Sequence, residues 1–262
     1  MNHANFLVCA VLVSCGDGVA AKPSSGCEAP TAAAGATNGS IEVNGVTRTY
    51  VLVVPSGSPR SPRPLVFGFH GLGGSGAGIR GYLGLETPAG GAAIFVYSDA
   101  LSDGSRTGWD DVGGRDLAFF DALAAKTQAE ACVDARRIFV TGFSHGGYWS
   151  NTLGCKRSSL LRAIAPLSGG GPWGACDDRP VAAWVAHGTS DRTVLPSQGQ
   201  GSRDHWLQVN HCGNSSTAVT PSPCISYDGC APGEPVVWCA FDGGHEVPSW
   251  VGGAVWSFFD AF

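Results

Sequence analysis

Short apolar runs recur along the chain after residue 63, and segments with a helical spacing of apolar residues separate them. The runs are nearly continuous in apolar character, which is typical of strands buried on both faces of a sheet. They cover residues 64–70, 92–97, 137–141, 163–167, 181–186 and 236–241. The helical segments cover residues 116–126, 145–155, 198–210 and 248–262. This alternation predicts an α/β fold in which a mostly parallel central sheet is flanked by helices.

The chain before residue 63 follows other patterns. Residues 41–43 and 48–54 flank Asn44-Gly45, a strong hairpin signal, so we expect an antiparallel pair of strands at the edge of the sheet. Residues 22–40 are mostly Pro, Ser, Ala, Gly and Thr with little to bury, which predicts a flexible linker. The folded domain is therefore expected to cover residues 41–262.

Residues 1–21 have the features of an export signal. The apolar run over residues 6–13 is too short to span a bilayer, and small residues follow it. A signal peptidase would cut near Ala20 or Ala21, whereas the sequence Leu-Val-Ser-Cys that ends at Cys15 resembles a lipoprotein box, in which this cysteine would carry a lipid. We favour free secretion and keep lipid anchoring at Cys15 as the alternative.

The cysteines independently indicate an oxidising compartment. Those that follow the predicted signal form an even set: Cys27, Cys132, Cys155, Cys176, Cys212, Cys224, Cys230 and Cys239. None of them forms a Cys-x-x-Cys pair, so disulfide bonds are a better interpretation than a zinc or redox site. The sequence leaves their pairing open, although the last four crowd one region and should staple it.

Composition limits the classes of function. With 262 residues, of which 44% are hydrophobic and 14% charged, the chain can bury one large core. The formal net charge is -5 and no cluster of Lys and Arg occurs, which argues against nucleic acid or an anionic membrane as a partner. The apolar runs are also too short for a membrane span.

The clearest chemical motif is Gly142-Phe143-Ser144-His145-Gly146, which lies between a predicted strand and a predicted helix. Glycines two positions either side of a serine let the backbone turn tightly enough to present the hydroxyl at the end of a strand, the nucleophile-elbow arrangement. A serine hydroxyl is a weak nucleophile unless a base takes its proton. The motif therefore predicts that Ser144 is a nucleophile served by a histidine and a carboxylate that follow other strands.

Asp191 and His245 are the expected partners of Ser144. Asp191 lies in the loop after one buried run, and His245 follows the last apolar run and precedes the last helix. The resulting chain order is Ser, then Asp, then His, as in α/β-hydrolases. Asp116 and Asp121 are interpreted as helix-face and capping residues. The pattern leaves rival acids open, namely Asp110, Asp111 and Asp242.

A tetrahedral intermediate of acyl transfer needs backbone N–H donors aimed at its oxyanion. One donor is expected to be the amide of His145, directly after the nucleophile. The other is expected from the glycine-rich turn after the run 64–70, with the amide of Leu72 as first choice and that of Gly71 as second. His70 is interpreted as a structural residue that braces this turn.

Two other kinds of site have weaker support. The segment 71–76 matches the Gly-x-Gly-x-x-Gly dinucleotide fingerprint, with Asp99 as the ribose acid, but an oxyanion turn explains the same glycines. His205 and His211 fall on different faces of a helix, and His245 lacks the second histidine of the zinc-protease motif. No metal and no organic cofactor is therefore expected.

Several segments resemble those of the secreted feruloyl esterases related to polyhydroxybutyrate depolymerases. They read FHGLGGS at 69–75, GRDLAFFDA at 114–122, GFSHGGY at 142–148, HGTSD at 187–191 and WCAFDGGH at 238–245. The similarity extends from about residue 41 to the C-terminus. The resemblance implies the α/β-hydrolase fold, the same Ser-His-Asp triad, and hydrolysis of hydroxycinnamate esters on plant cell-wall polysaccharides such as arabinoxylan or pectin.

The substrate is less well specified than the mechanism. Polyester depolymerases and acetylxylan esterases share these motifs and stay open as alternatives, as do a serine peptidase and a non-catalytic secreted binding protein. An aromatic acyl group favours flat apolar walls. Trp109, in a loop after a predicted strand, and Trp250, just after the histidine loop, are therefore the expected substrate contacts. The sequence leaves the oligomeric state open.

Overall fold

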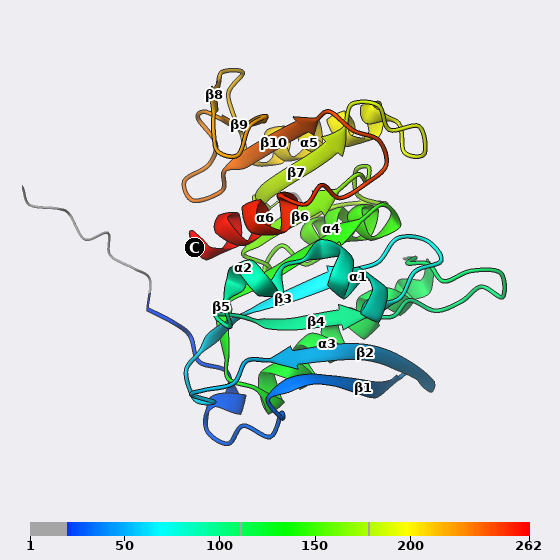
Figure 1. The fold of residues 1–262 in the computed structure, drawn as a ribbon, viewed down its shortest axis with the longest axis vertical. Helices are drawn as coiled ribbons and strands as arrows, with labels where there is room; N and C mark the ends of the chain where they lie inside the picture. Colours follow the sequence, from blue (N-terminus) through cyan, green and yellow to red (C-terminus); the bar gives the residue numbers. More distant parts are fainter. Residues whose placement is uncertain (1–19, 111, 178) are drawn as a thin grey trace, which may run out of the picture.

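One sheet organises the described part of the chain. The computed structural model describes residues 20–110, 112–177 and 179–262 (Figure 1). The strands are β1 (Gly35–Val43), β2 (Val46–Val54), β3 (Arg63–Phe69), β4 (Ile94–Ser98), β5 (Val133–Phe143), β6 (Ala163–Leu167), β7 (Ala182–Gly188), β8 (Ser216–Ala218), β9 (Cys224–Tyr227) and β10 (Val236–Phe241). Across the sheet they follow the order β1-β2-β4-β3-β5-β6-β7-β10-β9-β8.

The centre of the sheet, from β4 to β10, is parallel, and antiparallel strands close both edges. Strands β4, β6 and β7 are buried at every position, as their continuous apolar runs require. At one edge β1 pairs with β2 across the Asn44-Gly45 turn, which confirms the expected hairpin. The predicted α/β fold with a mostly parallel sheet is confirmed.

Helices cover both faces of the sheet (Figure 1). They are α1 (Gly76–Leu83), α2 (Glu86–Ala89), α3 (Arg115–Glu130), α4 (His145–Lys156), α5 (Pro196–Val209) and α6 (Val251–Asp260), with short 3-10 helices η1 (Ser25–Cys27) and η2 (Val112–Gly114). Phe119, Trp149 and Trp206 of α3, α4 and α5 pack into one core, and α1, α2 and α6 pack into the core on the opposite face. None of the described helices combines the length and the apolar content needed to cross a membrane.

The flexible linker predicted over residues 22–40 is wrong, because this segment belongs to the folded domain. The Ser24 amide donates to the carbonyl oxygen of Val133 at 2.8 Å, and the Ser24 hydroxyl accepts the Val133 amide at 3.0 Å. A disulfide bond joins Cys27 to Cys132, and the last part of the segment forms strand β1. Backbone hydrogen bonds and a covalent link replace the apolar burial that the composition lacks.

The cysteines that follow the predicted signal form disulfide bonds, as expected. The pairs are Cys27–Cys132, Cys155–Cys176, Cys212–Cys230 and Cys224–Cys239. The last two pairs staple the excursion between α5 and β10, which confirms that the final cysteines fix one region. Most of the predicted signal peptide over residues 1–21 lies outside the described residues, as does Cys15, so both stay predictions.

Candidate active site

The candidate nucleophile Ser144 stands at the sharp turn between strand β5 and helix α4. Its backbone angles are φ 58° and ψ -117°, and a left-handed φ is costly for a residue with a Cβ. Close packing holds this turn. A Cβ on Gly146 would lie 2.1 Å from the carbonyl oxygen of Phe69, and one on Gly142 would lie 2.4 Å from that of Gly146. Both glycines of the motif are therefore required at the carboxyl end of β5.

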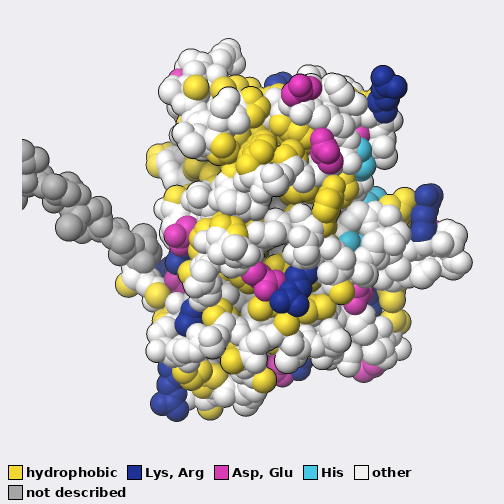
Figure 2. Space-filling model, viewed as in Figure 1, with side chains coloured by type: hydrophobic (Ala, Val, Ile, Leu, Met, Phe, Trp, Pro, Cys, Tyr) yellow, Lys and Arg dark blue, Asp and Glu magenta, His cyan; other side chains and the backbone are white. Residues whose placement is uncertain are grey.

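A chain of hydrogen bonds joins Ser144 to His245 and Asp191. The Ser144 hydroxyl lies 2.8 Å from Nε2 of His245, and Nδ1 of His245 lies 2.7 Å from Oδ2 of Asp191. The second oxygen, Oδ1, accepts the amides of Thr193 and Val194 at 2.8 and 3.0 Å. Histidine side chains are visible on the surface at the edge where the parallel strands end (Figures 1 and 2). The three residues expected from the sequence therefore meet in hydrogen-bonding geometry.

The surroundings of Asp191 favour its ionised form. Burial by itself would raise the pKa of Asp191, but hydrogen bonds from His245 and from the amides of Val194 and Thr193 outweigh it, so that the pKa lies below its ordinary value. Nε2 of the buried His187 lies 3.3 Å from Oδ2 of Asp191 and donates to the carbonyl oxygen of Val194 at 2.8 Å. Burial lowers the pKa of His187, which keeps that ring neutral as a support for the acid loop.

The glycine-rich turn after β3 lies against Ser144. A Cβ on Gly71 would come within 3.3 Å of the Ser144 Cβ. Nδ1 of His70 lies 2.7 Å from the carbonyl oxygen of Gly71, and its Nε2 accepts an amide of the loop after β4 at 3.0 Å, so this histidine braces the turn. Within the described residues, the amides of Leu72 and His145 have no hydrogen-bond acceptor. Both are therefore available to a ligand.

A pocket of about 510 Å³ opens at His145, the residue that follows the candidate nucleophile Ser144. We call it the aromatic pocket; its lining consists of Trp109, Asp110, Val112, His145 and Trp173. Trp109 is 2% exposed, and its indole N–H donates to the carbonyl oxygen of His70 at 2.9 Å. The Trp109 amide donates to Nδ1 of His145 at 3.1 Å. The predicted contact residue Trp109 is thus part of the pocket wall, although most of its ring is used in packing.

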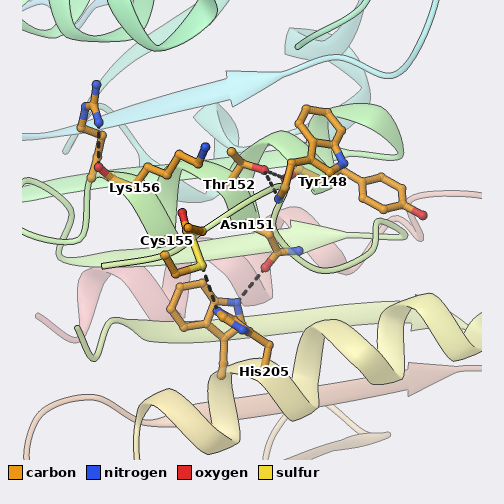
Figure 3. The surroundings of a disulfide bond; sticks show 11 residues. Tyr148, Asn151, Thr152, Cys155, Lys156 and His205 are labelled. Carbon is orange, nitrogen blue, oxygen red and sulfur yellow. Dashed lines mark hydrogen bonds between the residues drawn. A yellow bond between two sulfur atoms is a disulfide. The ribbon is translucent and has the colours of Figure 1, made fainter. Parts of the chain in front are cut away.

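Trp173 is a pocket residue that the sequence analysis missed. Its amide donates to the hydroxyl of Thr152 at 3.0 Å, and the disulfide Cys155–Cys176 ties the same loop to helix α4. Figure 3 shows Thr152 and Cys155 together on this helix. The ring of Trp173 stacks on Tyr148, with centroids 5.9 Å apart. The run of glycines that precedes Trp173, directly after a buried strand, is the signal that could have drawn attention to it.

Trp250, the other tryptophan expected at the substrate, lies in a different environment. It is half-buried, and its ring packs edge-on against Trp184 and Phe241, with centroids 6.2 and 6.3 Å apart. Trp250 is not one of the residues that line the aromatic pocket. Contact between Trp250 and substrate therefore stays a prediction.

The rival acids have other surroundings. Asp110 pairs with Arg115 at 2.5 Å, Asp242 is exposed, and Asp111 lies outside the described residues. Asp99, the acid of the dinucleotide alternative, accepts the first amide of helix α1 at 2.6 Å and so holds the glycine turn. In the described ranges, no group of three or more His, Cys, Asp and Glu side chains is placed to hold a metal ion.

Sequence comparison places the chain close to curated esterases. It is 38% identical over 257 residues to the probable feruloyl esterase C of Aspergillus terreus, and the match covers 90% of both chains. It is 36% identical over 245 residues to the feruloyl esterase C of Emericella nidulans, covering 86% of this chain and 87% of that one. No protein-family model matches the chain.

Solved structures show the same architecture at low sequence identity. An acetyl xylan esterase from Aspergillus awamori superposes with a TM-score of 0.68 at 18% identity, covering 85% of this chain and 99% of that one. A ferulic acid esterase from Anaeromyces mucronatus, solved with ferulic acid, gives a TM-score of 0.61 at 14% identity over 86% of this chain and 89% of that one. The fold is that of the α/β-hydrolases, and with the sequence matches it follows that the chain belongs to the feruloyl esterase family of carboxylic ester hydrolases.

Proposed function

We propose that this chain is a secreted serine esterase that hydrolyses hydroxycinnamoyl esters of plant cell-wall polysaccharides. The observation that carries the proposal is the hydrogen-bonded chain of Ser144, His245 and Asp191 beside the aromatic pocket. The names of the curated relatives supply the acyl group, because they are called feruloyl esterases. Flat indole walls suit a planar aromatic acid.

The reaction runs through an acyl-enzyme. His245, oriented by Asp191, takes the proton of Ser144 at Nε2 while the serine oxygen attacks the ester carbonyl. The ester C–O bond then breaks, and the imidazolium returns the proton to the sugar oxygen, which leaves as an alcohol. In the second half His245 takes a proton from water, whose oxygen attacks the acyl carbon. The bond from that carbon to the Ser144 oxygen then breaks, the imidazolium returns its proton to Ser144, and the free acid leaves.

The oxyanion formed in both halves needs donors that are in place before the reaction. We assign this role to the amides of His145 and Leu72, and keep the amide of Gly71 as the alternative to Leu72. None of these three amides has another acceptor within the described residues, which supports an oxyanion role for this turn and for His145. Because His70 braces the turn, these donors should reorganise little when negative charge develops.

The aromatic pocket is the proposed site of the acyl ring. At about 510 Å³ it has the size of ordinary small-molecule sites. His145, which follows the nucleophile directly, lines it, so an acyl group bonded to Ser144 can extend into it. Trp173 and Trp109 supply the aromatic walls, and Val112 is 81% exposed at the rim.

The substrate class is tested by comparing three substrates with one enzyme preparation: methyl ferulate, an acetylated xylan and a polyhydroxybutyrate film. We expect methyl ferulate to give the highest kcat/KM. A preference for the acetylated xylan or the polyester film would replace the proposed substrate by that alternative. Labelling by a fluorophosphonate probe separates an esterase from a non-catalytic binding protein, and a casein assay addresses peptidase activity.

Export is proposed from the predicted signal over residues 1–21 together with the four disulfide bonds. We expect the mature protein in the culture medium, with an N-terminus near Ala20 or Ala21. Intact-mass measurement of the secreted protein checks this. A membrane-bound product that carries lipid on Cys15 would show the lipoprotein alternative instead.

A further inference from the structure

The imidazole of His145 lines the aromatic pocket with one ring nitrogen unused. Its Nδ1 accepts the backbone N–H of Trp109 at 3.1 Å. In a neutral ring the proton must then sit on Nε2, since one nitrogen accepts and the other donates. Among the described residues, no group accepts a hydrogen bond from this Nε2. His145 therefore offers an N–H donor to a molecule bound in the pocket.

Its surroundings keep this ring neutral and fixed. Burial is the main cause that lowers the pKa of His145, and the neighbouring His70 and Arg106 lower it further. The ring also packs against Trp173, with centroids 5.2 Å apart. A neutral ring held on two sides presents its donor in one tautomer and one orientation.

The pocket also contains a hydrogen-bond acceptor, which makes a contrast possible. The carboxylate of Asp110 accepts the Val112 amide at 3.0 Å and pairs with Arg115 at 2.5 Å. A phenolic hydroxyl can donate to such a carboxylate, whereas a methoxy oxygen can only accept. The two pocket residues therefore favour different substituents on an aromatic ring.

We propose that the Nε2–H of His145 donates a hydrogen bond to an oxygen substituent on the ring of the bound acyl group. The pocket then selects hydroxylated and methoxylated cinnamoyl esters over unsubstituted cinnamoyl esters. This inference rests on the proposed function and deepens it. It assigns recognition of the acyl ring to the side chain of His145, the residue whose backbone amide is the proposed oxyanion donor.

The first test compares three substrates with the wild-type protein: methyl ferulate, the methyl ester of dimethoxycinnamic acid, and methyl cinnamate. Methylating the phenol removes its donor but keeps the oxygen acceptors. We therefore expect both oxygenated esters to exceed methyl cinnamate in kcat/KM by about 3- to 10-fold, the range of one neutral hydrogen bond. If the dimethoxy ester is as slow as methyl cinnamate, the protein recognises a phenolic donor, and the proposal is overturned.

Matched variants identify the residue. In His145→Asn the shorter amide can still accept the Trp109 N–H but cannot reach the position of Nε2, so the preference for methyl ferulate over methyl cinnamate should disappear. In His145→Gln the side-chain amide can reach that position, and the preference should persist. Asp110→Asn should also keep it. The ratio of the two kcat/KM values is the readout, because a general loss of structure lowers both values together.

The failures of the two proposals are distinguishable. Wild-type protein that hydrolyses none of the three esters would remove the proposed function and this inference with it. Hydrolysis of all three at equal kcat/KM, or a preference that survives in His145→Asn, would overturn the assignment of His145 and leave the esterase function standing.

Discussion

Asp116 and Arg48 form a buried ion pair behind the aromatic pocket, and we expect Asp116→Asn to destabilise the protein strongly. Nη1 of Arg48 lies 2.8 Å from Oδ1 of Asp116, and the two side chains are 1% and 0% exposed. The guanidinium carbon stands 3.9 Å from the ring centroid of Phe119. Asparagine keeps the shape of aspartate but removes the charge that balances Arg48.

The expected size of the effect follows from this burial. Removing one partner of a buried ion pair leaves an uncompensated charge and costs about 3–5 kcal/mol in unfolding free energy. At about 2–4 °C per kcal/mol for a domain of this size, Tm should fall by roughly 6–20 °C. Replacing both partners, as in Arg48→Met with Asp116→Leu, removes both buried charges and should restore most of the loss.

The same pair should also affect substrate binding, because Oδ2 of Asp116 accepts the Asp110 amide at 2.8 Å. Asp110 and its neighbour Trp109 belong to the wall of the aromatic pocket. Weakening this hydrogen bond loosens the wall. We expect Asp116→Asn to raise KM for methyl ferulate more than KM for p-nitrophenyl acetate, whose small acyl group does not fill the pocket.

Urea and thermal unfolding with the disulfides intact measure the stability change. The matched control is Asp121→Asn on the same helix, because Asp121 pairs with Arg157 at 2.7 Å but is 43% exposed. Removing an exposed pair should cost at most about 1 kcal/mol. Equal losses in the two aspartate variants would refute the argument that burial makes the Arg48 pair expensive to break.

Three further predictions concern the acid and a disulfide. Asp191→Asn should lower kcat for methyl ferulate by about 10⁴-fold, because the catalytic imidazole loses its orienting acid; Asp242→Asn should leave it unchanged, and the reverse result would reassign the acid. The pKa of Asp191 is lower in the folded protein than in the unfolded chain, so its ionised form stabilises the fold above the unfolded pKa of about 3.9, and this contribution is lost as pH falls through the folded pKa. In urea unfolding, the difference in unfolding free energy between wild type and Asp191→Asn should therefore become smaller below about pH 4. Replacing Cys155 and Cys176 by serine should raise KM for methyl ferulate more than KM for p-nitrophenyl acetate, because the loop that carries Trp173 loses its covalent link to helix α4. Equal increases in KM for the two substrates would contradict a role of this loop in binding the acyl ring.

The fold could be predicted where the apolar runs are continuous. The runs 163–167 and 236–241 coincide with β6 and β10, because strands buried on both faces need apolar side chains at every position. Helix α1 escaped prediction because its sequence, GAGIRGYL, is rich in glycine. It begins at the Ser75 cap, whose hydroxyl accepts the Gly78 amide, and packing of its buried side chains against the sheet stabilises it.

Part of the candidate site could also be predicted from the sequence. Ser144, Asp191 and His245 each follow a predicted strand, and they could be expected to lie close together because the carboxyl ends of parallel strands meet at one edge of the sheet. For Trp173 the sequence offers only the preceding run of glycines, because the position of its loop depends on the disulfide Cys155–Cys176, whose pairing the sequence leaves open. The sequence indicates only a helix-face role for Asp116, because it does not reveal that Arg48 on a distant strand lies opposite it in the core.

The role of Ser144 is tested most directly by the turnover of methyl ferulate by Ser144→Ala. Loss of a serine nucleophile in an acyl-transfer enzyme lowers kcat by up to about 10⁶-fold, so we expect hydrolysis to fall to the background rate while Tm stays at the wild-type value. A folded Ser144→Ala protein that still hydrolyses methyl ferulate at a rate near that of the wild type would contradict the central claim that this serine carries the acyl group.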